Sequence, residues 1–191
     1  PASHAGAVRA NRDCLLVAGF DLRVDRRRSF ARRWHCRRVY EELGVLLETE
    51  RPDILHVATP TETHADLLVQ AAAQRVPLVI CEKPLSSSAA EAGHAMDACR
   101  AAGTIVLVNH ERRYSRDYLH ARELIRGKSC GALLSIHARL YMGRGHRPAE
   151  ILLEDGTHLV DVIRFLTDRE IEPRHTEGNL SEAAETLQIL F

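Results

Sequence analysis

The sequence predicts an α/β fold organised around a doubly wound parallel sheet. Two short apolar runs, Ile54–Ala58 and Pro77–Cys81, have the length of buried strands. The stretch Thr61–Arg75 lies between them, and its apolar residues at helical spacing are Leu67, Leu68, Ala71 and Ala72. A strand, a crossover helix and a second strand in this order form the βαβ unit of an open parallel sheet.

The residues before this unit predict further alternating elements. The first residues read as the end of a helix followed by a turn. The expected elements that follow are a strand Cys14–Phe20, a helix Val24–Trp34, a short strand Val39–Tyr40 and a helix Glu41–Glu50 that ends before Pro52.

Strand and helix signals continue after the unit. Ser86–Ser88 can cap a helix Ala89–Ala102, and Gly103 can close it. The later expected elements are a strand Thr104–Val108, a helix Tyr118–Arg126, a strand Ala132–Tyr141, a loop Gly143–Pro148, a helix within Ile151–Leu166 and a strand Leu187–Phe191 that looks cut off midway.

The composition excludes several classes of protein. The formal net charge of the 191 residues is +0, so no overall field favours nucleic acid or an anionic membrane. The basic run Arg23–Arg38 is typical of a solvated helix face. No apolar stretch approaches the ~20 residues of a membrane span, and no signal peptide opens the chain. Five cysteines without ligand spacing indicate reduced thiols of a cytoplasmic protein and no zinc site.

Polar residues follow each strand of the central unit. Thr59, Pro60, Thr61 and His64 come after the first strand, and Glu82, Lys83 and Pro84 come after the second. Asn109 follows the next predicted strand. Doubly wound sheets bind their ligands at the carboxyl ends of the strands. The sequence therefore predicts the chemistry at this edge of the sheet.

The segments ATPTETH and CEKP, about twenty residues apart at two strand ends, together resemble the glucose–fructose oxidoreductase and inositol dehydrogenase family (Gfo/Idh/MocA). The resemblance implies a Rossmann-like NAD(P)-binding domain over residues 1–110. Residues 111–191 would begin an α+β substrate domain. It also implies hydride transfer between a nicotinamide cofactor and a hydroxyl or carbonyl carbon of a sugar, a polyol or a derivative.

The resemblance assigns cofactor contacts to the residues at the strand ends. Asp21 would hydrogen-bond the adenosine ribose hydroxyls, which points to NAD. Arg23 and Arg26 are near enough to accept a 2′-phosphate, so NADP stays open. Asn109 would approach the nicotinamide ribose. The other expected cofactor residues are Thr59, Pro60, Thr61, His64, Glu82 and Lys83.

The resemblance also implies a catalytic pair. Lys83 would lie between the nicotinamide and the substrate hydroxyl, where its ammonium stabilises the developing alkoxide. His158 would take the hydroxyl proton and contact substrate, together with Arg112 from the NHERRY segment. Gly156 and His158 match the family's aspartate–x–glycine–x–histidine signature.

The departure from that signature concerns the carboxylate. Glu154 stands for the usual aspartate and Asp155 follows it, so either one could orient the His158 ring. Asp161 matches a further acidic position of the family.

The family opens with a strand and a G-x-G-x-x-G loop, and a His-Ala pair follows the third glycine by three residues. If His4-Ala5 is that pair, the third glycine falls on Pro1. We therefore expect the first strand and the glycine loop upstream of this chain, which would be a fragment clipped at both ends.

Two alternatives to the dehydrogenase stay open. A non-catalytic relative that binds the dinucleotide as a sensor or regulator would have no need of both Lys83 and His158. The chain as given could also be inactive. The expected partners are a small sugar or polyol substrate and, through the C-terminal sheet of the complete protein, further copies of itself.

Overall fold

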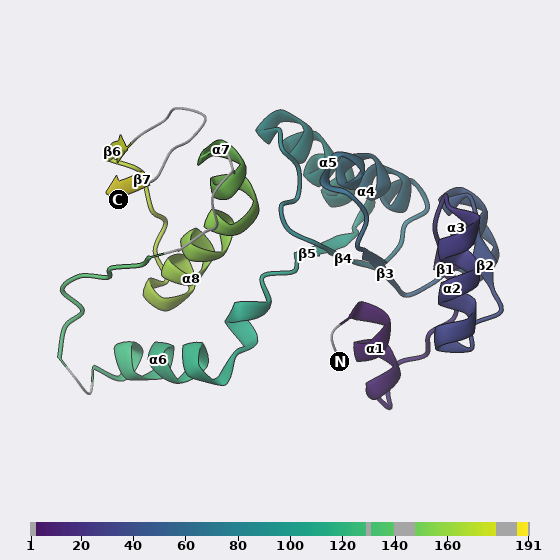
Figure 1. The fold of residues 1–191 in the computed structure, drawn as a ribbon, viewed down its shortest axis with the longest axis horizontal. Helices are drawn as coiled ribbons and strands as arrows, with labels where there is room; N and C mark the ends of the chain where they lie inside the picture. The colour runs from purple at the N-terminus through teal and green to yellow at the C-terminus, as the bar shows by residue number, and fades with distance from the viewer. Residues whose placement is uncertain (1–2, 129–130, 140–147, 179–186, 191) are drawn as a thin grey trace. The chain divides into compact units, whose positions relative to one another are not determined.

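The computed structural model describes residues 3–128, 131–139, 148–178 and 187–190, which form two compact units (Figure 1). Unit 1 is Pro1–Asn109 and unit 2 is His110–Phe191, and each is described by itself. No helix in the described ranges is both long and apolar enough to cross a membrane.

Unit 1 contains two parallel sheets. In the smaller sheet, β1 (Gly19–Phe20) pairs with β2 (Val39–Tyr40). In the larger, the strands follow the order β3-β4-β5, with β3 at Ile54–Val57, β4 at Leu78–Cys81 and β5 at Ile105–Val108. The register places Val57 opposite Cys81 and Cys81 opposite Val108, so the three strands end level with one another. This is the Rossmann-type α/β fold that the sequence predicts.

The helices of unit 1 precede or connect these strands. They are α1 (His4–Ala10), α2 (Val24–Trp34), α3 (Leu43–Glu50), the 3₁₀ turn η1 (Thr61–Thr63), α4 (His64–Ala73) and α5 (Ala89–Ala102). Ser88 caps α5 through its hydroxyl, which accepts from the Glu91 amide, and Gly103 closes the helix with φ 77°. The expected bounds of α2 and α5 are confirmed.

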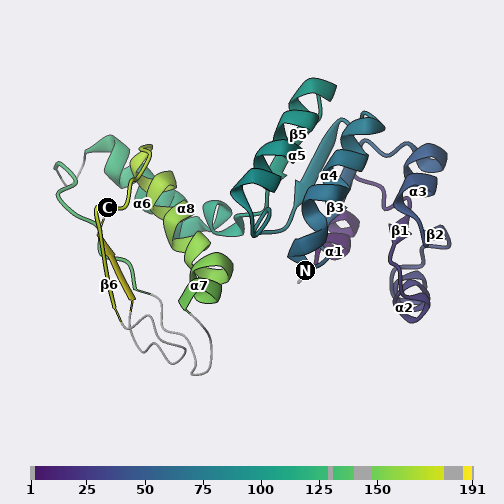
Figure 2. The same ribbon diagram turned by 90° about the horizontal axis from the view of Figure 1, so that it is seen from above.

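The core of unit 1 lies between the β3-β4-β5 sheet and the two helices α4 and α5, which run side by side over one face (Figures 1 and 2). Val79 and Cys81 on β4 and Leu68 on α4 are fully buried in it. Alternate residues of the strands point to the other face. There Ile105 and Leu107 are exposed, and His56 is half-buried close to α1.

In its described residues, unit 2 contains short helices and a two-stranded antiparallel sheet. The 3₁₀ turn η2 (Glu111–Tyr114) leads into α6 (Arg116–Gly127). A second helical segment runs through α7 (Pro148–Ile151), the π-helical turn η3 (Leu152–Gly156) and α8 (Thr157–Thr167). The two-stranded antiparallel sheet of β6 (His175–Gly178) and β7 (Leu187–Leu190) follows.

Two expected strands differ from the structure. The expected strand Cys14–Phe20 is reduced to the two residues of β1, because only Gly19 and Phe20 have a paired neighbour, in β2. The expected strand Ala132–Tyr141 is wrong over residues 132–139, which carry no regular structure and are mostly exposed. Apolar alternation cannot make a strand without a partner edge. The rest of that strand and most of the expected loop Gly143–Pro148 lie outside the described residues.

Candidate functional site

The ring of His64 joins the carboxyl ends of β3 and β4. His64 opens α4 and is 1% exposed. Its Nδ1 lies 2.9 Å from the Pro84 carbonyl oxygen, and its Nε2 lies 2.9 Å from the Thr59 carbonyl oxygen. A neutral ring donates from one of these nitrogens and a protonated ring from both. The ring thus lies between the loop after β3 and the loop after β4.

The Glu82 carboxylate is the centre of a second set of contacts at the same edge. Its Oε1 accepts from His4 Nε2 at 2.7 Å and from Asn109 Nδ2 at 2.8 Å, and its Oε2 accepts from the Lys83 amide at 3.3 Å. Burial raises the pKa of Glu82, but the hydrogen bonds from His4 and Asn109 outweigh it and lower the pKa overall. Glu82 is therefore an anion that orders the ends of β4 and β5.

The remaining predicted residues of this edge lie around these contacts. Thr59 and Thr63 share a hydrogen bond of 2.7 Å between their hydroxyls, and Thr63 also donates to the Pro60 carbonyl at 2.7 Å. The peptide bond between Lys83 and Pro84 is cis. The structure thus gathers the predicted residues from Thr59 to Thr61, His64, Glu82, Lys83 and Asn109 at one end of the larger sheet.

Asp21 lies at the carboxyl end of β1. Its Oδ1 accepts from the Arg23 amide at 2.8 Å, and Arg26 Nη1 lies 4.0 Å from Oδ2. A cavity of about 260 Å³ opens beside it, and its lining includes Gly19 and Phe30. A side chain at Gly19 would collide with the Phe30 ring, because an added Cβ would lie 2.5 Å from Cε1. A half-buried carboxylate beside a cavity can accept from ribose hydroxyls, so the residues present fit the adenosine end of a dinucleotide.

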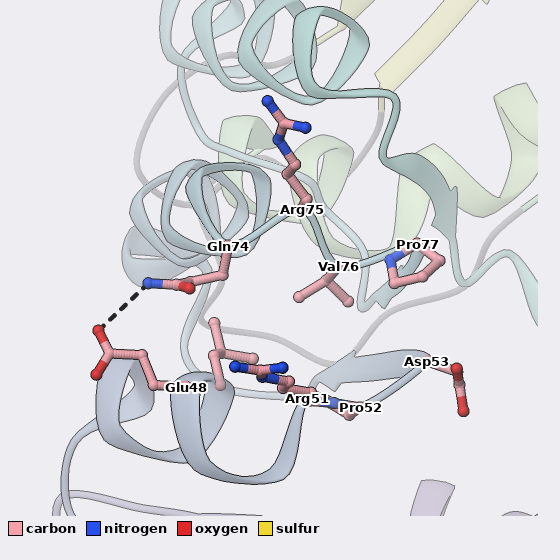
Figure 3. A pocket seen from close by; sticks show the side chains of 9 residues that line it. Glu48, Arg51, Pro52, Asp53, Gln74, Arg75, Val76 and Pro77 are labelled. Atoms are coloured by element: carbon pink, nitrogen blue, oxygen red, sulfur yellow. Dashed lines mark hydrogen bonds between the residues drawn. The ribbon is translucent and has the colours of Figure 1, made fainter.

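A larger cavity, of about 440 Å³, lies at the opposite ends of the strands (Figure 3). Pro52 and Asp53, which precede β3, and Val76 and Pro77, which precede β4, line it. Gln74 donates to Glu48 across its rim at 3.4 Å. Ligands of doubly wound sheets bind at the carboxyl ends, and this cavity is at the amino ends. It is separate from the predicted site.

In unit 2, the face of α8 that carries His158 is buried. His158 and Asp161 are each 5% exposed. Glu111 Oε2 lies 3.8 Å from His158 Nδ1, which is too long for a direct hydrogen bond. The His110 ring packs edge-on against His158, with centroids 6.0 Å apart. Burial lowers the pKa of His110, and the Asp161 carboxylate opposes that shift.

Asp161 and Arg113 fix η2 against α8. Arg113 Nε donates to both carboxylate oxygens, at 3.0 and 2.8 Å, and Nη2 donates to Oδ1 at 2.6 Å. The hydrogen bond that it donates to Asp161 raises the pKa of the Arg113 guanidinium. Since η2 also carries Glu111, this ion pair holds Glu111 near His158. Of the two predicted carboxylates, Glu154 is exposed and Asp155 is half-buried. Their role beside His158 stays a prediction.

Sequence reasoning missed several residues of these clusters, His4, His56 and Arg113 among them. His56 occupies an apolar strand position, and its partner His4 served only to align the chain start. Arg113 is one of many arginines, and only the Asp161 contact distinguishes it. The histidine in the middle of a buried strand was a usable signal, because a polar ring on a sheet face needs a partner. Among the described residues, no group of three or more His, Cys, Asp or Glu side chains could hold a metal ion.

Comparison with known proteins finds a matching family model and curated relatives. A family model described as "Oxidoreductase family, NAD-binding Rossmann fold" (GFO_IDH_MocA) matches residues 2–110. A myo-inositol 2-dehydrogenase of Thermotoga maritima is 25% identical over 186 residues, which cover 93% of this chain and 54% of that protein. An inositol 2-dehydrogenase of Gluconacetobacter diazotrophicus is 31% identical over 177 residues, covering 86% and 52%. The chain spans about half the length of the curated relatives it matches.

Solved structures share the fold. An NAD-binding protein from Listeria innocua matches with a TM-score of 0.77 at 24% identity. The match covers 93% of this chain and 54% of the Listeria chain. A myo-inositol 2-dehydrogenase from Lactobacillus plantarum has a TM-score of 0.73 at 20% identity, with coverages of 92% and 55%. At these identities the likeness describes the fold alone.

The Asp161–Arg113 pair gives a stability prediction. Asp161→Asn removes a buried charge and leaves the half-buried guanidinium without its carboxylate, so we expect a loss of about 1–3 kcal/mol in the free energy of unfolding by urea. Asp168→Asn is the matched control. Asp168 is more exposed, it binds Arg122 and Arg126, and its loss should cost clearly less than that of Asp161. Equal losses for the two variants would contradict this account.

Proposed function

Because this chain belongs to the GFO_IDH_MocA family of oxidoreductases, we propose that the whole protein is an NAD(P)-dependent dehydrogenase that acts on a hydroxyl or carbonyl carbon of a sugar or polyol. The carrying observation is the strand-end cluster. Glu82, Lys83 and Asn109 meet there, and the Glu82 carboxylate accepts from both neighbours. The two inositol dehydrogenases named above support a polyol as the substrate class.

In this proposal the residues of unit 1 bind the cofactor. Asp21 accepts hydrogen bonds from the adenosine ribose hydroxyls, and Asn109 approaches the nicotinamide ribose. The loop from Thr59 to Thr61, held in place through His64, borders the same strand ends. When bound, the nicotinamide supplies the hydride acceptor or donor. The protein contributes the binding, the orientation and the charges around it.

Lys83 and His158 have the proton and charge roles. The Lys83 ammonium stabilises the alkoxide that develops as the substrate hydroxyl loses its proton. The His158 ring takes that proton as general base, and Arg112 binds the substrate. The carboxylate that orients the ring is Glu154 or Asp155 in the family signature. Glu111 is a further candidate, because its oxygen lies 3.8 Å from His158 Nδ1.

We propose that NAD is preferred over NADP. A 2′-phosphate would meet the Asp21 carboxylate, and two of the nearby arginines already have partners. Arg23 binds Asp25 through Nε at 3.1 Å and Nη2 at 2.8 Å, and Arg27 binds Glu41 at 2.9 Å. Arg26 is the arginine near Asp21 that could still turn toward a phosphate. The opposing charge of Asp21 favours the ribose hydroxyls.

A non-catalytic sensor is the rival function. It would use the same dinucleotide residues, but it would not depend on a lysine and a histidine with chemical roles. The first experiment below separates the two functions. A dehydrogenase oxidises a polyol and loses turnover when Lys83 is replaced, whereas a sensor has no turnover to lose.

The first prediction from this proposal concerns Lys83. In the whole protein, Lys83→Ala should lower kcat by about a hundredfold or more while the cofactor Kd changes little, as expected for the loss of a positioned catalytic group. Steady-state oxidation of a polyol panel that includes myo-inositol, with NAD, measures it. Lys128→Ala, at an exposed lysine of unit 2, is the control and should leave both values unchanged. Near-normal turnover of Lys83→Ala would remove Lys83 from the mechanism.

The second prediction concerns His158. If its ring is the base, the oxidation rate should rise with pH through one ionisation in the ordinary histidine range, about 6–8. His158→Asn should abolish that limb, whereas His94→Asn on the exposed side of α5 should keep it. A limb that survives His158→Asn would assign the base to another group, and Tyr114 and Asp155 would be tested next.

The third prediction concerns the cofactor. Asp21→Ser should raise the KM for NAD by about 10–100-fold, the range for a lost hydrogen bond to a charged group, and should change the KM for NADP far less. Asp13→Ser, at an exposed position before β1, should change neither. If the unmodified protein used NADP as well as NAD, the proposed preference would be wrong.

A further inference from the structure

A continuous chain of side-chain contacts runs from β3 to the end of β5, and the proposed function does not use its first two members. His56 Nδ1 on β3 lies 2.9 Å from His4 Nδ1 on α1. His4 Nε2 lies 2.7 Å from Glu82 Oε1, which also accepts from Asn109 Nδ2. The two rings meet edge to face, with centroids 5.0 Å apart.

The acceptor at one end decides where the protons lie. A carboxylate only accepts, so the His4 nitrogen that faces Glu82 carries a hydrogen. When both rings are neutral, the other nitrogen of His4 has a lone pair, and His56 must donate from Nδ1. When His4 is protonated, its Nδ1 donates and His56 must offer a lone pair. In both states exactly one hydrogen lies between the two Nδ1 atoms.

A second proton on the pair would break this bond. If both rings were protonated, two N–H groups would face each other at 2.9 Å. The surroundings agree with this reading: burial lowers the pKa of His56, and the charge of His4 lowers it further. For Glu82 the partners that act on the carboxylate are His4, Asn109 and the Lys83 amide. Two protonated rings are therefore incompatible with this contact.

We propose that His4 and His56 are positioning residues, which share one hydrogen between their Nδ1 atoms and thereby hold the Glu82 carboxylate against Asn109 and the Lys83 amide. Without His56, the His4 side chain on α1 loses the contact at Nδ1 that fixes the orientation of its ring. Glu82 then loses a directed donor and can turn away from Asn109. The inference deepens the proposed function and rests on it, because Asn109 and Lys83 are the residues assigned to cofactor and substrate.

The first test is the tautomer of each ring in this chain, and it needs no activity. Long-range ¹H–¹⁵N NMR on histidine-labelled protein at about pH 8.5, where histidine is ordinarily neutral, reports which nitrogen carries the hydrogen. The expected result is Nδ1–H for His56 and Nε2–H for His4. Free histidine prefers Nε2–H, so a His56 ring in that form at this pH would overturn the inference. The variants below assign the signals.

The second test asks whether the pair positions Asn109. His56→Phe keeps the ring volume and removes the nitrogen, whereas His56→Asn places an amide where Nδ1 was. Hydrogen exchange of the Asn109 side-chain amide should become about three- to tenfold faster in His56→Phe and return to the original rate in His56→Asn. His94→Phe on α5 is the control with unchanged exchange. Equal exchange in His56→Phe and the unmodified chain would overturn the positioning role.

These outcomes separate the inference from the proposed function. If His56→Phe does not fold, as judged by circular dichroism, the tautomers of the unmodified chain still decide the matter. Turnover that survives Lys83→Ala would refute the catalytic role and leave the histidine pair standing. If the two rings lacked the expected tautomers while Lys83 proved essential for turnover, the positioning role of the histidine pair alone would be refuted.

Discussion

The buried ring of His64 is the constraint on which the carboxyl edge of the larger sheet depends. A polar ring taken out of water costs free energy unless its nitrogens find partners. Here both nitrogens face backbone carbonyls, one from the loop after β3 and one from the loop after β4. The two segments ATPTETH and CEKP are separate in the sequence, and the His64 ring brings them into contact. The start of α4 cannot turn without losing both contacts.

Glu82 extends that constraint to β5 and α1. One carboxylate oxygen receives the His4 ring and the Asn109 amide, and the other faces the Lys83 amide. A single charge thus orders three elements and the backbone on which the Lys83 side chain stands. Burial, with a smaller contribution from the Glu82 charge, raises the pKa of the adjacent Cys81 thiol to about 12, which keeps that cysteine unreactive.

In unit 2 a buried carboxylate likewise fixes the elements around a histidine. Asp161 is buried beneath His158 on α8, and its bidentate partner Arg113 comes from η2. The Arg113 and Arg122 guanidiniums also stack over the Phe165 ring, at 5.6 and 4.2 Å from its centroid. Packing and charge together fix η2, and with it Glu111, beside the His158 ring.

The sequence by itself determined the α/β class, the βαβ unit, the bounds of α2 and α5 and the group of residues at the strand ends. Those features follow from local periodicity, caps and turns. It misjudged the strands Cys14–Phe20 and Ala132–Tyr141, because pairing depends on a neighbouring edge that apolar alternation does not reveal. Only the tertiary structure joined His4 to Glu82 and Arg113 to Asp161, which are 78 and 48 positions apart. No local pattern encodes such contacts, since their partners meet only when separate elements pack.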